Sequence, residues 1–317
     1  MKAWVFDGLA AALELSSGPM TRGKLRRFLA GALAHRQAGA ALAAAFGLAV
    51  APAQAADDAP LQSAPDGRRL VLAFADDFAA FRTLCQGGGR WRSTFGDGGQ
   101  NTVGARTLSG NAELEVYVDP CLAGAPAGAR PDPFRAGGEG LEIIAEPARP
   151  ELAQALEGHP YASGLITTQP SFRQTYGYFE MKARLPRGKG LWPAFWLLPA
   201  DQSWPPEIDV IESIGDPGVI YQTVHSKVAD QPGVKVEVPR DPDGFHVFAV
   251  EWDPRWIVWY LDGRETARKP TPPDVDKPMY MLVNLAVGGH WPGAPDASTR
   301  FPAAMSVRWV RAYRFVP

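Results

Sequence analysis

From Arg69 to the end of the chain, apolar and polar residues alternate in short runs that glycine and proline interrupt. A helical period of 3.6 residues is confined to Pro150–Leu156, where we expect a short helix. Many short strands separated by turns are typical of an antiparallel β-sandwich or barrel, so the chain is predicted to be all-β. The runs that predict strands are Leu70–Phe74, Ala112–Val118, Leu141–Ala145, Gly177–Arg184, Glu207–Ser213, Val219–His225, His246–Trp252, Trp256–Leu261, Met279–Leu285 and Met305–Phe315.

The strand pattern predicts a single domain. Its runs continue over residues 69–317 without a linker-like change in composition, and an all-β domain of that length is common. The stretch Ala123–Gly140 is rich in glycine and proline, and we expect it to be a long loop inside this domain. Residues 56–68 are expected to form a short linker before it.

The first 55 residues have a different pattern. Basic residues precede an Ala-rich apolar run, Ala38–Val50, which is followed by the small-x-small sequence Ala53-Gln54-Ala55. This order is typical of a secretory signal peptide, with Met20 as a possible alternative start. The apolar run is shorter than the roughly 18 residues that a membrane span needs. We therefore expect a secreted or periplasmic protein without a membrane anchor after cleavage; an uncleaved anchor or a disordered leader is the alternative.

Charge and cysteine content restrict the partners. The formal net charge of −2 gives no reason to expect nucleic acid or an anionic membrane as partner, and the protein is expected to be a monomer. No cluster has metal-ligand spacing and no glycine loop is suited to phosphate, so no cofactor or metal is expected. Cys85 and Cys121 could pair in an oxidising compartment, with two unpaired thiols as the alternative.

Three carboxylates lie within the six residues of Glu207–Glu212. In a strand, Glu207 and Asp209 share one face, and strict alternation would turn Glu212 into the core. A one-residue bulge at Val210–Ile211 would return Glu212 to the face of the other two acids. Two carboxyls held close together are what retaining glycosidases require; a solvated acidic strand face is the alternative.

The residues before this run are aromatic. In Gly190–Pro199, Trp192 and Trp196 fall on one face if the segment is extended. The apolar faces of sugar rings stack on such side chains, and Trp291 is a third candidate for this role. Core packing is the alternative for any one of them.

These motifs resemble glycoside hydrolase family 16, whose members include laminarinases, lichenases, agarases and carrageenases. The similarity extends from Phe74–Phe78 to Trp309–Tyr313, and the family signature E-x-D-x-x-E is matched within Glu207–Glu212. It implies a jelly roll of two antiparallel sheets, with the concave sheet forming a glycan cleft. It also implies Glu207 as nucleophile, Asp209 as its orienting acid and Glu212 as general acid/base.

The resemblance further implies substrate contacts on several strands and loops. A cleft position is implied for Glu180, and for Lys182 where the family often has arginine. The other candidates for sugar contacts are His225, Asn284, Trp291 and Asn111, the last in a motif that is thinner here than the family's Asn-Asn-Glu. The last strand often carries an aspartate that binds a structural calcium; Arg308 stands there, so we predict no calcium at that site.

The resemblance implies a retaining endo-glycosidase that acts on a polysaccharide. The aromatic segments favour a β-1,3- or β-1,3-1,4-glucan, and a bacterial exopolysaccharide is nearly as well supported, whereas sulfated galactans are disfavoured because no basic cleft is evident in the sequence. Transglycosylation on the same glycans, or glycan binding without catalysis, are the alternative functions.

Overall fold

The computed structural model describes residues 58–96, 101–229, 231–241 and 244–316. The chain divides into two compact units, Met1–Ala55 and Ala56–Pro317, and the described residues all belong to the second. The expected signal peptide lies outside them and stays a prediction. Among the helices of the described part, none is long and apolar enough to cross a membrane.

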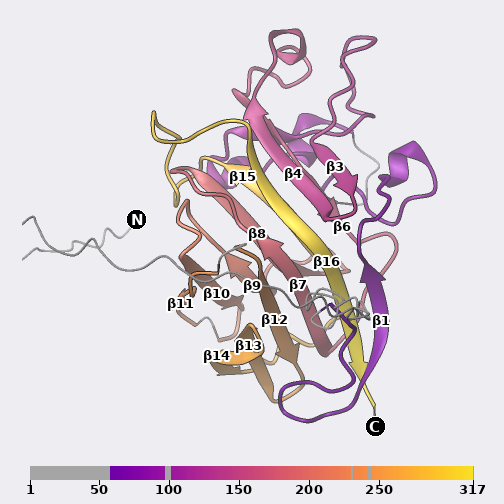
Figure 1. Ribbon diagram of the computed structural model, residues 1–317, viewed down its shortest axis with the longest axis vertical. Helices are drawn as coiled ribbons and strands as arrows, with labels where there is room; N and C mark the ends of the chain where they lie inside the picture. Colours follow the sequence, from indigo (N-terminus) through magenta and orange to yellow (C-terminus); the bar gives the residue numbers. More distant parts are fainter. Residues whose placement is uncertain (1–57, 97–100, 230, 242–243, 317) are drawn as a thin grey trace, which may run out of the picture. The chain divides into compact units, whose positions relative to one another are not determined.

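The described residues form two β-sheets, with four short 3-10 helices in the connections: η1 (Leu84–Gln86), η2 (Val103–Ala105), η3 (Ser109–Asn111) and η4 (Pro150–Leu152). The larger, ten-stranded sheet contains, in spatial order, β14 (Arg264–Pro270), β13 (Trp256–Leu261), β12 (His246–Trp252), β7 (Gly177–Arg184), β16 (Ala303–Phe315), β4 (Gly140–Pro147), β5 (Tyr161–Ser163) and β2 (Glu115–Tyr117). β1 (Leu70–Asp76) pairs with β16, and β3 (Phe134–Gly137) pairs with β4 (Figure 1).

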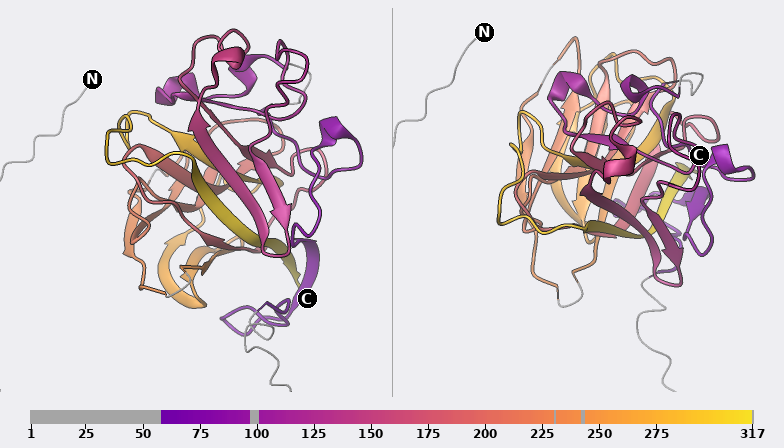
Figure 2. Two further views of the ribbon diagram at one scale, coloured as in Figure 1. Left: turned by 45° about the horizontal axis from the view of Figure 1, so that its top comes forward. Right: turned by 90° about the horizontal axis from the view of Figure 1, so that it is seen from above.

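The smaller, six-stranded sheet contains, in order, β11 (Val234–Glu237), β10 (Val219–His225), β9 (Glu207–Glu212), β8 (Leu191–Pro199), β15 (Met279–Val287) and β6 (Leu165–Thr167). All of its pairings are antiparallel. The two sheets are stacked (Figure 2), so the all-β prediction is confirmed and the sandwich is favoured over a barrel.

Alternation along the strands directs apolar side chains into one shared core. On β8, Phe195 and Leu197 point inward and are fully buried, whereas Trp192 and Trp196 occupy the opposite face. Trp259 of the ten-stranded sheet spans the core, and its indole N–H donates to the carbonyl of Asp209 at 2.8 Å. This bond ties the large sheet to the strand that carries the acidic residues.

Three parts of the structure differ from the sequence predictions. The expected loop Ala123–Gly140 contains β3, which forms a tight hairpin with β4. The expected helix near Pro150 is the single 3-10 turn η4. The described residues of the expected linker are packed: Ala64 is buried, and Asp58 accepts hydrogen bonds from Lys182 and Trp309. The linker prediction was wrong because buried donors of the large sheet bind this segment.

Cys85 and Cys121 form a disulfide. It joins η1 to the segment that follows β2, across 36 residues of sequence. The expected pairing is therefore confirmed, and closing a loop of this length stabilises the fold by about 3–4 kcal/mol in the chain-entropy model.

Candidate active site

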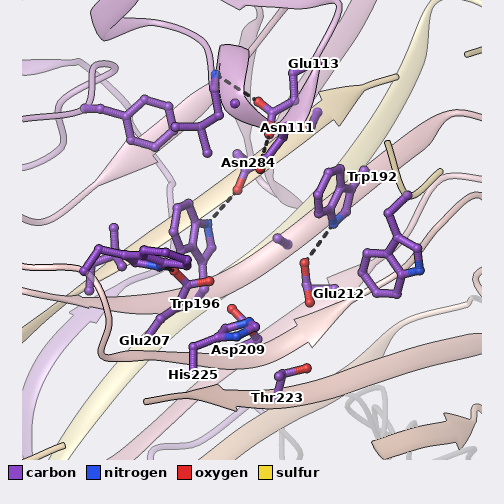
Figure 3. Close-up of a pocket in the computed structure, with 18 of the residues that line it drawn as sticks. Asn111, Glu113, Trp192, Trp196, Glu207, Asp209, Glu212, Thr223, His225 and Asn284 are labelled. Atoms are coloured by element: carbon purple, nitrogen blue, oxygen red, sulfur yellow. Dashed lines mark hydrogen bonds and ion pairs between the residues drawn. The ribbon is translucent and has the colours of Figure 1, made fainter. Parts of the chain in front are cut away.

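A cleft of about 870 Å³ lies on the face of the six-stranded sheet that points away from the core. It is lined by side chains from β8, β9, β10, β11 and β15 and from loops near η3 and after β8 (Figure 3). All three predicted acids line it, as do Trp192, Trp196, His225, Asn111, Asn284 and Trp291. Cavities of this size that combine aromatic walls with a few polar groups are typical ligand sites.

Residues facing the cleft form rows across the strands, because directly paired residues share a face. One row is Asn284, Ala194, Glu212, Tyr221 and Lys235. A second row is Trp196, Asp209 and Thr223, and a third pairs Glu207 with His225. The lining therefore extends across the sheet from β15 to β11, with the acids of β9 near its middle.

The predicted bulge in β9 is confirmed. Asp209 pairs with Thr223, and Glu212 pairs with Tyr221, so two residues of β9 lie opposite one residue of β10. The extra residue leaves Val210 and Ile211 in the core while Glu212 returns to the cleft. One strand thus presents all three carboxyls to the same space.

Glu212 is set up to carry a proton at neutral pH. Its Oε1 accepts a hydrogen bond from the indole N–H of Trp192 at 2.9 Å. Burial raises its pKa to about 8; the Trp192 hydrogen bond opposes this rise, and the negative charge of Glu207 adds to it. A carboxylic acid that is still protonated near pH 7 can serve as a general acid.

Glu207 interacts with Trp204 from the loop after β8 and with Asp209 on its own strand. The indole N–H of Trp204 donates to its Oε2 at 2.7 Å, and Trp204 is itself 62% exposed. Burial and the adjacent Asp209 raise the pKa of Glu207, while His225 and the Trp204 hydrogen bond lower it. The negative charge of Asp209 therefore makes ionisation of Glu207 less favourable, and the two carboxyls titrate together.

Asp209 lies deepest of the three and is buried. Its Oδ2 is 3.2 Å from Nε2 of His225, which projects from the neighbouring strand β10. Burial and the charge of Glu212 raise its pKa to about 6, against the lowering effect of His225. His225 thus supports the acidic pair from the side opposite to Trp196, the other neighbour of Asp209.

A chain of hydrogen bonds fixes the far end of the cleft. The indole N–H of Trp196 donates to Oδ1 of Asn284 at 2.8 Å, and the Asn284 amide donates to the hydroxyl of Tyr117 at 2.9 Å. The same hydroxyl faces Glu113, to which Asn111 donates at 2.9 Å. The predicted residues Asn111, Asn284 and Trp196 therefore belong to one polar network.

Trp291 reaches the cleft from the loop after β15 and is 42% exposed. Its ring contacts Trp192 edge-on, with centroids 5.6 Å apart, and Tyr221, with centroids 4.7 Å apart. These three rings form an aromatic wall beside Glu212.

Glu180 and Lys182 are not in the cleft, contrary to the prediction. Both lie on β7 in the ten-stranded sheet. Glu180 accepts from the hydroxyl of Tyr313 at 2.6 Å, and Lys182 donates to Asp58 at 2.8 Å. Glu180 is thus bound within the ten-stranded sheet and Lys182 is bound to Asp58, so both serve the sheet opposite to the cleft.

Sequence reasoning missed several residues that line the cleft, namely Phe95, Trp204, Tyr221, Thr223, Lys235 and Tyr280. Tyr221 and Thr223 could have been found, because they alternate with His225 on a predicted strand. Trp204 lies only three residues before Glu207, but its contact with that carboxyl depends on how a loop folds back.

Two groups of His, Cys, Asp and Glu in the described part of the chain lie close enough to hold a metal. One contains Cys85 and Cys121, whose sulfurs are joined in the disulfide. The other contains Glu207, Asp209 and His225: Nε2 of His225 lies 3.2 Å from Oδ2 of Asp209, and Glu207 accepts a hydrogen bond from Trp204. This pattern fits acid–base chemistry.

Comparison with known proteins supports the same interpretation. Residues 141–311 match the family described as Glycosyl hydrolases family 16. The chain belongs to glycoside hydrolase family 16. The resemblance in the sequence and the jelly-roll fold that it implied are therefore confirmed.

Relatives in this family cover most of the second unit. The endo-1,3-1,4-beta-glycanase EglC of Rhizobium meliloti (strain 1021) is 42% identical over 247 residues, which are 77% of this chain and 52% of that protein. The beta-glucanase of Rhodothermus marinus is 37% identical over 232 residues, 65% of this chain and 76% of the relative. The solved laminarinase from Rhodothermus marinus is 33% identical with a TM-score of 0.63, covering 79% of this chain and 99% of that one. The chain spans about half the length of EglC.

Proposed function

We propose that this family 16 chain is a retaining, endo-acting β-glucan hydrolase. The observation that carries the proposal is the placement of Glu207, Asp209 and Glu212 on one face of β9, inside a cleft with aromatic walls. A double-displacement reaction requires one carboxyl that attacks and another that donates a proton, and Glu207 and Glu212 can take these two roles.

In the reaction, Glu212 gives its proton to the glycosidic oxygen while Glu207 attacks the anomeric carbon. The bond to the leaving sugar breaks as the bond to Glu207 forms, and Asp209 holds Glu207 in line. Glu212, now a carboxylate, then takes a proton from water as the water oxygen displaces Glu207. The two displacements retain the anomeric configuration.

An endo mode follows from the length of the cleft. Its lining spans five strands of the sheet, and the acids lie on the third of them, so sugars bind on both sides of the cleaved bond. Trp196 and the Asn284 network serve one side, and Tyr221, Thr223 and Lys235 serve the other.

The lining supports a neutral glycan. Its acidic members are Glu113, Glu207, Asp209 and Glu212, and its lysine is Lys235 at the edge strand. We propose β-1,3- or β-1,3-1,4-glucan, or a related bacterial exopolysaccharide, as substrate, since the similar proteins are named endo-1,3-1,4-beta-glycanase and beta-glucanase. We further propose that the protein is a monomer and that it acts in the periplasm or the medium. The disulfide supports the second of these proposals, because disulfides persist in oxidising compartments.

The decisive experiment measures reducing-sugar release by the unit Ala56–Pro317 on laminarin, mixed-linkage glucan, agarose, carrageenan, and neutral and acidic exopolysaccharides. We expect release on a glucan or a neutral exopolysaccharide, and a loss of roughly 10³-fold or more in Glu207→Ala, because the nucleophile is absent. The matched control is Glu180→Gln, which alters a buried glutamate of the other sheet and should keep kcat. Equal activity in Glu207→Ala and the unaltered protein would show that the assignment is wrong.

Transglycosylation is a second candidate, favoured by one observation. Trp291 and Tyr221 offer an exposed aromatic surface beside Glu212, where an acceptor sugar could replace water. The sizes of the products over time distinguish the two reactions, because transfer yields oligosaccharides longer than the starting chain.

A further inference from the structure

Trp192 was expected to stack on sugar, but its polar edge is already engaged. It lies on β8 opposite Ala286, one strand away from Glu212, and its N–H points at Oε1 of that carboxyl (Figure 3). The ring is held on two sides. Trp291 packs against it edge-on, and a Cβ added at Gly289 would lie 3.1 Å from its Cζ3.

We propose that Trp192 is a positioning residue that assigns the proton of Glu212 to Oε2. The inference rests on the proposed function and names a role within the same site. An indole N–H can only donate, so the oxygen that faces it must act as an acceptor. With Oε1 occupied at 2.9 Å, the acidic hydrogen is placed on Oε2.

This assignment matters in both halves of the reaction. In the first, the Oε2 hydrogen moves to the glycosidic oxygen, the bond from that oxygen to the anomeric carbon breaks, and Glu207 bonds to the carbon. In the second, Oε2 receives a proton from the attacking water while the Glu207 bond breaks. Throughout, the Trp192 N–H stays on Oε1 and stabilises the carboxylate that forms between the two steps.

The surroundings of Glu212 leave this role to Trp192. On β9, the negative charge of Glu207 disfavours ionisation of Glu212. The cross-strand partners of Glu212 are Tyr221 on β10 and Ala194 on β8. Trp192 donates a hydrogen bond to Glu212 from the neighbouring strand β8. Trp204 plays the corresponding part for Glu207, from a loop rather than a strand.

The test compares two substrates whose leaving groups differ in their need for a proton, and so distinguishes a role in proton donation from a role in packing. In Trp192→Phe, kcat/KM on the polysaccharide should fall roughly 10- to 100-fold, because proton donation is misaligned. On a 2,4-dinitrophenyl oligosaccharide, whose leaving group needs no proton, kcat/KM should change by less than about 3-fold. The basic limb of the pH profile on polysaccharide should move upward, because the carboxylate of Glu212 has lost its donor.

Two comparisons complete the test. Trp204→Phe should shift the acidic limb and leave the basic limb in place, since it removes a donor from Glu207. If Trp192→Phe folds poorly, incorporation of β-(3-benzothienyl)alanine at position 192 keeps the ring and deletes only the N–H, and the same results are expected.

Equal losses on both substrates, or an unmoved basic limb, would overturn the proposal, because a purely structural tryptophan predicts them. If the unaltered unit releases sugar from no substrate, the proposed function fails instead. In that case, titration of the Glu212 carboxyl by 13C NMR still decides the inference: its pKa must rise when the N–H is removed.

Discussion

At the scale of single residues, the acids of β9 are held where their charged forms are disfavoured. Glu212 is the clearest example, since burial raises its pKa to about 8 and the Trp192 hydrogen bond only partly opposes this. A site that keeps a carboxyl protonated at neutral pH gains an acid for catalysis and loses stability as that proton leaves.

This gives a stability prediction with a definite sign. Glu212 titrates near 4.5 when unfolded and near 8 when folded, so between these values the folded protein binds more protons. The contribution of Glu212 to the free energy of unfolding therefore falls as the pH rises from about 4.5 to 8. Glu212→Gln removes the titration and should be more stable than the unaltered protein at pH 8.5, by on the order of 1–3 kcal/mol, with a smaller difference at pH 4.5.

Thermal unfolding at the two pH values measures this effect. Glu265→Gln is a control of opposite sign, because the hydrogen bond from Arg268 lowers the pKa of that exposed carboxyl. Its substitution should destabilise the protein slightly at pH 8.5 and somewhat less at pH 4.5, since this contribution is lost only as the pH falls through the lowered pKa. A Glu212→Gln protein that is no more stable than the unaltered one at pH 8.5 would show that the carboxyl is not strained by burial.

At the scale of the element, the common orientation of the three acids depends on the β-bulge in β9. The sequence alone predicted the bulge, because strict alternation would have buried Glu212 next to aliphatic side chains. The family resemblance, in contrast, misplaced Glu180 and Lys182 in the cleft. They lie on β7, where seven consecutive residues are buried. A strand covered on both faces shows no alternation, so its sequence could not indicate which face, or which sheet, meets the cleft.

The bulge can be removed without directing Asp209 and Glu212 to opposite faces of the strand. Deleting Ile211 leaves Asp209 and Glu212 two positions apart, which is the spacing of an unbulged strand with both acids on one face. We expect a folded protein, destabilised by about 2–4 kcal/mol through the lost core side chain, that keeps measurable activity. Ile211→Ala makes the same core change with the bulge intact and is the matched control.

Denaturant unfolding and reducing-sugar release measure the two properties separately. If the deletion folds but is as inactive as Glu212→Gln while Ile211→Ala is active, the bulge does more than direct Glu212 to the cleft. In that case the tie from Trp259 to the Asp209 carbonyl is the next contact to examine.

At the scale of the whole second unit, loops supply part of the cleft lining, and residues 58–69 pack against the large sheet. Many of the strands and the shared face of the acids could be anticipated, because they follow from local alternation and a known motif. Trp204 and Phe95 could not, since both approach the cleft from loops whose paths depend on tertiary packing. The same is true of residues 58–69, before β1, whose polar composition did not indicate that they would pack against the large sheet.

That segment leads to a prediction at the scale of the fold. Asp58 accepts hydrogen bonds from Lys182 at 2.8 Å and from Trp309 at 2.9 Å, and Arg311 donates to the adjacent carbonyls. Asp58→Ala would leave the largely buried ammonium of Lys182 without its partner, so the free energy of unfolding should fall by about 1–3 kcal/mol.

The activity should respond differently from the stability. Because these contacts lie on the sheet opposite to the cleft, kcat of Asp58→Ala should equal that of the unaltered protein at temperatures where both are folded. Asp66→Ala, which breaks a more exposed pair with Arg68, should cost less than about 1 kcal/mol. Burial opposes the ionisation of Asp58, but its hydrogen bonds lower its pKa overall, so the difference should vanish as the pH falls below 4. An unchanged melting temperature at pH 7 would mean that the Asp58 contacts do not stabilise the fold, and would leave the other contacts of this segment, such as those of Arg68 with Glu251 and Asp253, to do so.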